Sequence, residues 1–164
     1  MDESLTLLGL SVPDSALSRR ARGLITDFAA PFLVNHSVRV YAWAVELAGH
    51  DRLQFDPEIL YVSAMLHDIG LVPAYDLGGC YEVDGAVAAE RLVGEAGTDV
   101  TGHRFADIRP AMIPGMLAAY PRVDFKREFT ALIVDQASRK PTCPAAEMIA
   151  TGILEEIARA PFES

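Results

Sequence analysis

The stretch SAMLHDIGL, Ser63–Leu71, decides how this chain is interpreted, because a histidine and an aspartate end an otherwise apolar run. The residues before them are typical of a buried helix. Burying an imidazole beside a carboxylate is costly unless something compensates both groups. A helix cap can do so, and so can a metal ion. The choice depends on which other side chains the fold brings to His67 and Asp68.

Helical patterns dominate the sequence around this stretch. Apolar residues recur at three- and four-residue spacing, and Ser15, Asn35 and the Asp56-Pro57-Glu58 start signal are typical of helix N-termini. The expected helices cover residues 15–30, 35–49, 56–68, 84–97, 124–138 and 143–160. The prolines of Pro110–Pro121 predict either short kinked helices or a mobile segment that acts as a lid. No convincing alternating strand pattern occurs, so the predicted fold is all-α, a compact helical bundle.

Length and composition limit the classes of protein to consider. The 164 residues predict a single domain, 1–164, with the motif core at about 34–138 and a C-terminal helix at about 143–160. The net charge of −9 disfavours binding to nucleic acid. No apolar run reaches the roughly 18 residues needed to cross a membrane. The acidic N-terminus resembles no signal peptide, so a cytoplasmic location is expected.

The two cysteines, Cys80 and Cys143, lie far apart in the sequence and form no C-x-x-C pair. This spacing indicates neither a zinc knuckle nor a disulfide framework. We therefore expect two reduced thiols.

Two further side chains are candidates to join His67 and Asp68. Of the other three histidines, His50 follows a helix end and His103 lies in a polar loop, whereas His36 lies in an apolar helix. Asp135 ends the apolar run ALIV near the C-terminal end of its helix, where the helix dipole disfavours a negative charge. Imidazole and carboxylate ligands together suit a divalent transition metal.

His36, the HD pair about thirty residues later, and the distant Asp135 together resemble the HD-domain superfamily of metal-dependent hydrolases. The resemblance covers roughly Val34–Ser138. It implies an α-helical fold and one divalent ion, of Zn, Fe, Mn or Ni, bound by His36, His67, Asp68 and Asp135. It also implies a metal-bound water as the nucleophile.

Within this superfamily the sequence is most similar to the cyanamide-hydratase-like branch. Leu71 replaces the lysine of cyclic-dinucleotide phosphodiesterases and the glutamate of nucleoside-monophosphate phosphatases. The segments NHSVRVYAWA at 35–44 and YEVDGAVAAERLV at 81–93 resemble the hydratase-like pattern. That branch often has another histidine in the following helix, and the corresponding IRPAMIPGM has none, so cyanamide itself is not established as the substrate.

Four residues are candidates for roles in catalysis and substrate binding. Asp68 and Glu82 are the catalytic candidates, because the YEVDG segment follows the HD loop closely enough to fold over the site. Arg39, one turn beyond His36, and Lys140 are candidates for binding an anionic or polar substrate group. The expected partner is a small-molecule substrate, and a symmetric homodimer remains open.

Three classes of function compete at this point. The first is a hydrolase or hydratase acting on a small molecule, and the second is a phosphohydrolase acting on a small phosphate ester or nucleotide. The third is a catalytically silent, metal-binding regulatory module.

Overall fold

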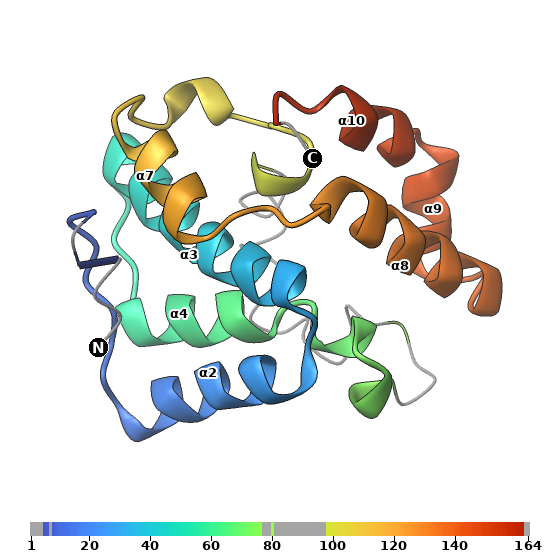
Figure 1. Ribbon diagram of the computed structural model, residues 1–164, viewed down its shortest axis with the longest axis horizontal. Helices are drawn as coiled ribbons and strands as arrows, with labels where there is room; N and C mark the ends of the chain where they lie inside the picture. The colour runs from blue at the N-terminus through green and yellow to red at the C-terminus, as the bar shows by residue number, and fades with distance from the viewer. Residues whose placement is uncertain (1–4, 7, 77–79, 81–97, 163–164) are drawn as a thin grey trace.

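The computed structural model describes residues 5–6, 8–76, 80 and 98–162, and these residues form helices and loops without a strand (Figure 1). The all-α prediction is therefore confirmed. The main helices are α2 (Ala16–Phe28), α3 (Pro31–Asp51), α4 (Pro57–Leu66), α7 (Met112–Ala119), α8 (Phe125–Arg139), α9 (Pro144–Ala150) and α10 (Ile153–Arg159). Short 3-10 turns are η1 (Ile69–Leu71), η2 (Pro73–Tyr75) and η3 (Phe105–Asp107).

Local capping explains where α2 and α4 begin. The Ser15 hydroxyl accepts a hydrogen bond from the amide of Ser18 at 3.0 Å. Asp56 caps α4 in the same way, by accepting from the amides of Glu58 and Ile59. Both predicted caps are confirmed.

The predicted start of α3 is wrong by four residues. The helix begins at Pro31, a residue suited to the first helical position, with Ala30 as its N-cap. Asn35 lies inside the helix, and its side-chain amide donates to the carbonyl of Pro121 at 2.8 Å. The polar side chain that resembles a cap is thus engaged in a long-range contact.

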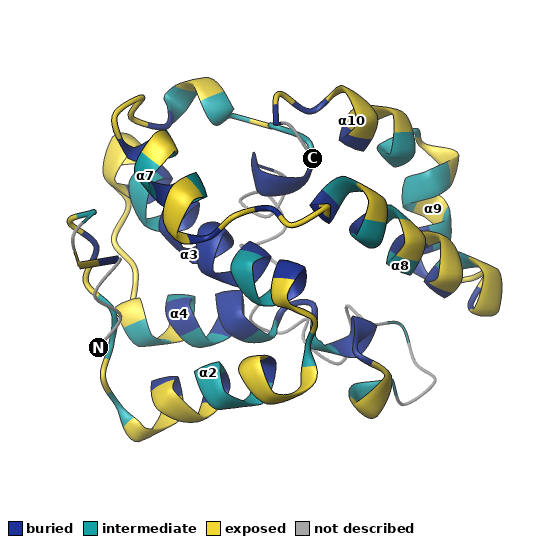
Figure 2. Ribbon diagram, in the orientation of Figure 1, coloured by how far each residue is buried: buried dark blue, intermediate teal, exposed yellow. Residues whose placement is uncertain are grey.

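α3 is the central helix. It contacts α4 on one side and α8 on the other, while α2 packs against both α3 and α4. Figure 1 shows α2 and α4 side by side below α3, with α8, α9 and α10 grouped on the right, toward the N-terminal end of α3. Residues along the middle of α3 are buried (Figure 2).

The buried apolar residues form two clusters, and α3 contributes to both. The first lies among α2, α3, α4 and α7 and includes Trp43. The second joins the N-terminal turns of α3 to η1, α8, α9 and α10, and it includes Phe129. The HD pair follows α4 and precedes η1, so it lies where these two clusters meet.

Three other predictions concern the second half of the chain. The segment Pro110–Pro121 forms a single helix, α7, with Met112 and Met116 buried in the first cluster. The C-terminal helix is divided into α9 and α10 at Gly152, which has a φ of 100°. The helix expected after Asp84 lies outside the described residues.

The expectation of two free thiols is wrong, because Cys80 and Cys143 form a disulfide with Cα atoms 5.3 Å apart. Sequence spacing did not reveal the pair, since 63 residues separate the two cysteines and only the fold brings them together. None of the described helices is both long enough and apolar enough to span a bilayer.

Candidate metal centre

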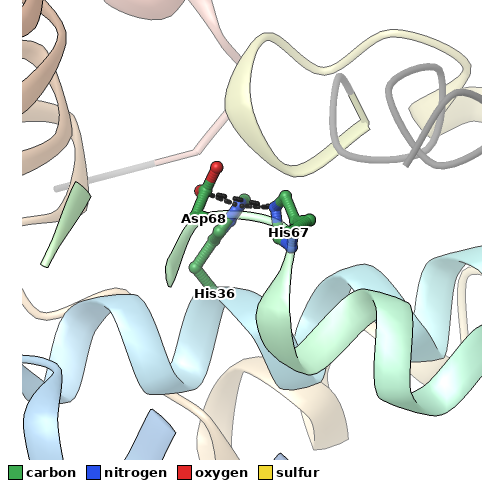
Figure 3. Close-up of side chains that lie close together, drawn as sticks. All are labelled: His36, His67 and Asp68. Carbon is green, nitrogen blue, oxygen red and sulfur yellow. Dashed lines mark hydrogen bonds and ion pairs between the residues drawn. The ribbon is translucent and has the colours of Figure 1, made fainter. Parts of the chain in front are cut away.

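His36, His67 and Asp68 lie together in the interior (Figure 3). His36 comes from α3, and the other two follow the last turn of α4. The Nε2 atoms of the two imidazoles are 3.2 Å apart. Oδ2 of Asp68 lies 3.3 Å from each of them.

Contacts on the far side of each imidazole determine where its proton lies. Nδ1 of His67 is 2.9 Å from the carbonyl of Ala64, and Nδ1 of His36 is 2.8 Å from a carboxylate oxygen of Asp99. Both oxygens accept hydrogen bonds, so each Nδ1 is the donor. In the neutral imidazoles, the lone pair of each Nε2 therefore points toward the other ring and toward Asp68.

Three electron-rich atoms thus converge on one point. Oδ2 of Asp68 is buried and accepts no hydrogen bond from the part of the chain that the structure describes, although two ring nitrogens lie near it. Ligands about 2.0–2.1 Å from one tetrahedral ion are roughly 3.4 Å apart, close to the spacings observed here. The donor set and the unsatisfied carboxylate oxygen therefore fit a divalent transition metal.

In the metal-free protein the cluster favours positive charge. Burial disfavours the charged form of His67, but the Asp68 carboxylate outweighs it and raises the pKa of His67 above its usual range. Burial also disfavours the charged form of Asp68, which raises the pKa of its carboxyl, but the two imidazoles outweigh this effect and hold that pKa well below its usual range. The site thus attracts a proton when it lacks a metal.

A second carboxylate, Asp99, contacts the cluster on the far side of His36, and it is missing from the sequence-based predictions. It is fully buried in residues 98–100, which are helical. Besides contacting His36, it accepts hydrogen bonds from Nε and Nη2 of Arg39 at 2.7 and 2.8 Å and from the indole of Trp43 at 3.1 Å. Nη1 of Arg122 lies 3.2 Å from Oδ1 of Asp99, the oxygen that also accepts from Trp43. Asp99 therefore fixes the orientation of His36.

One signal for Asp99 was available in the sequence. Arg39 lies one turn after His36, within a helix of mainly apolar residues, and a buried arginine requires a carboxylate partner. The sequence alone did not show which carboxylate it was, since 60 residues separate the pair.

The structure does not bring Asp135 to the other three predicted ligands. Asp135 lies on the exposed face of α8, with over half of its side chain accessible, and pairs with Arg139 at 2.7 Å. This arginine lowers the pKa of Asp135. The ion pair accounts for a negative charge near the end of this helix. The inward position of that turn is occupied by Gln136, which is buried.

The two predicted substrate-binding cations are engaged in other contacts. Arg39 is completely buried, and besides Asp99 it donates to the backbone carbonyls of Tyr120 and Pro121. Lys140 is largely buried, and its ammonium lies 2.6 Å from Asp76. The catalytic candidate Glu82 lies outside the described residues.

Comparison with known families agrees with this geometry. Residues 33–98 match the family model of the HD domain. The match includes His36, His67 and Asp68 and ends one residue before Asp99. It supports the HD superfamily, whose members are generally metal-dependent hydrolases that bind divalent metals. No curated protein matches the chain.

Proposed function

We propose that this chain is a metal-dependent hydrolase that acts on a small molecule. The observation that carries the proposal is the convergence of two imidazole lone pairs and an unsatisfied carboxylate oxygen within 3.3 Å of one another. His36, His67 and Asp68 would hold one divalent ion, such as Zn, Fe, Mn or Ni. A bound ion of this kind lowers the pKa of coordinated water and so supplies hydroxide near neutral pH.

The protein's own groups then have distinct tasks. Asp99 orients His36, the carbonyl of Ala64 orients His67, and the hydrophobic surroundings keep bulk water away from the ligands. Asp68 combines ligation with the capacity to accept a proton. Glu82 stays a catalytic prediction from the sequence.

A neutral small molecule is the substrate class that we favour over a phosphate ester. Arg39 and Lys140 are the cations that the sequence predicts for substrate binding, and Arg139 directly precedes Lys140. All three donate to carboxylates, to Asp99 in the first case and to Asp76 in the other two. A phosphohydrolase needs cations that are able to hold the phosphate. The motif resemblance favours a hydratase-like reaction, such as addition of water to a cyanamide or a small nitrile.

The test begins with metal analysis of the purified protein by mass spectrometry. The metal-loaded protein is then incubated with cyanamide, small nitriles and a panel of phosphomonoesters. We expect one ion per chain and turnover of a neutral substrate that stops on chelation and returns when metal is added. Turnover of phosphoesters alone would replace the hydratase proposal. Stoichiometric metal without any turnover would favour a silent regulatory module.

A further inference from the structure

The segment that follows the HD pair is fastened to the C-terminal end of α8. Asp76, just after η2, accepts hydrogen bonds from Nη1 of Arg139 at 2.7 Å and from Nζ of Lys140 at 2.6 Å. Its carboxylate is only 14% exposed, so water weakens these contacts less than those of a surface pair. Asp76 therefore attaches this segment to the corner of the bundle where α8 ends and α9 begins.

A disulfide attaches the same segment to the same corner. Cys80 follows Asp76 by four residues, and its partner Cys143 follows Lys140 by three and forms the N-cap of α9. The non-covalent and covalent links therefore run in the same order along both segments. Only the disulfide can be opened by a change in redox conditions.

This corner is coupled to the metal ligands through the backbone. Asp68 directly precedes η1, whose Leu71 belongs to the same apolar cluster as Phe129 and Ile133 of α8. Because Oδ2 of Asp68 accepts no hydrogen bond from the described residues, the backbone on either side of Asp68 helps to determine where this oxygen lies. Any loosening between residues 69 and 76 therefore changes the position of a ligand.

We propose that the Cys80–Cys143 disulfide is a redox-sensitive clasp that keeps the Asp68 segment in its metal-binding position. This inference rests on the proposed metal site. Reduction by a dithiol gives one electron and one proton to each cysteine sulfur, and the dithiol becomes a disulfide. The Asp76 contacts remain after reduction, so the segment is loosened and not released.

Partial exposure of Cys80 favours this regulatory role. Cys143 is buried, whereas Cys80 is of intermediate exposure, so a reductant can approach the bond from that side. Disulfides are rare in the reducing cytosol, where those that occur are usually catalytic or redox-sensing. A redox-sensing bond thus reconciles this disulfide with the cytoplasmic location that the sequence predicts.

The experiment compares four forms of the full chain: oxidised and reduced wild type, and oxidised and reduced Asp76→Asn. Reductant is removed anaerobically before Zn²⁺ affinity is measured by competition with a chelating dye. We expect reduction to weaken Zn²⁺ binding about threefold in the wild type, and at least tenfold when combined with Asp76→Asn, because both links restrain one segment. Hydrogen exchange in residues 69–76 should be faster in the reduced than in the oxidised wild type, and fastest in reduced Asp76→Asn.

Two controls separate the clasp from other effects of reduction. The Cys80→Ser/Cys143→Ser variant has no thiols that bind Zn²⁺ and should match the reduced wild type. Asp14→Asn removes an exposed carboxylate that pairs with Arg19 and should leave the effect of reduction unchanged.

Equal affinity and equal hydrogen exchange in the two redox forms would overturn the clasp, and so would two free thiols in protein purified in air. Absence of Zn²⁺ binding in the oxidised protein would instead overturn the metal site. The clasp would then be judged by hydrogen exchange alone, and equal rates would overturn it.

Discussion

Oδ2 of Asp99 accepts a hydrogen bond from Nδ1 of His36 at 2.8 Å, and this contact determines which nitrogen of His36 faces Asp68. Asp99→Asn removes the negative charge and allows the amide to donate to Nδ1, which would turn the lone pair away from the site. We expect metal affinity to fall by about 10- to 100-fold, as for other groups that orient a ligand. Metal titration of the variant checks this.

The control for this substitution is Asp107→Asn, which removes a partly exposed carboxylate that pairs with Arg104. It should bind metal as tightly as the wild type. Unchanged affinity in Asp99→Asn would show that the orientation of His36 does not depend on Asp99.

Arg39 is the main cation holding the buried charge of Asp99, through two hydrogen bonds of 2.7 and 2.8 Å. Arg39→Met leaves that carboxylate with Arg122 as its one remaining arginine partner among the described residues. Removing one partner of a buried pair typically costs about 3–5 kcal/mol, so we expect a loss of this size in the free energy of unfolding. Urea denaturation measures it.

The double variant Arg39→Met/Asp99→Asn tests the cause of this loss. Because it also removes the unpaired charge, it should recover part of the lost stability. Strict additivity of the two single substitutions would contradict direct coupling between Arg39 and Asp99.

Asp135 and Asp68 were both predicted as metal ligands, and the structure places only Asp68 beside the two histidines. We expect Asp68→Ala and His67→Ala to abolish metal retention while helical circular dichroism is largely preserved. Asp135→Asn should retain metal fully, since its carboxylate pairs with Arg139 on the surface. Metal analysis after gel filtration distinguishes the variants, and loss of metal in Asp135→Asn would return Asp135 to the ligand set.

The error at Asp135 shows the limit of motif spacing. The inward face of α8 is formed by Phe129, Ile133 and Gln136, at intervals of four and three residues. One residue is a rotation of about 100°, so Asp135 points away from the direction of Gln136. An apolar run followed by an aspartate predicts the helix correctly, but it does not show which side chain of the last turn points inward.

Local and long-range features differ in how well the sequence predicts them. The caps at Ser15 and Asp56 depend on amides two or three residues away, and both were predicted correctly. The HD pair was recognised as a candidate ligand pair because the helix, its end and both side chains lie within one short stretch. The role of Asp99 and the disulfide of Cys80 depend on contacts across about 60 residues, which no local pattern records.

The raised pKa of His67 makes the metal-free protein sensitive to pH. Because the folded-state pKa lies above the ordinary value of 6.5, protonation of His67 stabilises the fold below pH 6.5, and this contribution disappears as pH rises through the folded-state pKa. Asp68 has a lowered pKa, so its contribution is present above the ordinary value of 3.8 and is lost as pH falls through its folded-state pKa. Both contributions describe one ion pair and count once.

The stability due to this pair should therefore be greatest between about pH 4 and 6.5 in chelator-treated protein. Metal must displace the proton of His67, so metal affinity should rise with pH across the same titration. Histidine NMR signals and thermal denaturation at several pH values measure the two effects. Asp68→Asn removes the group that raises the pKa of His67 and should lower that pKa. An unchanged His67 titration in this variant would show that Asp68 is not the cause.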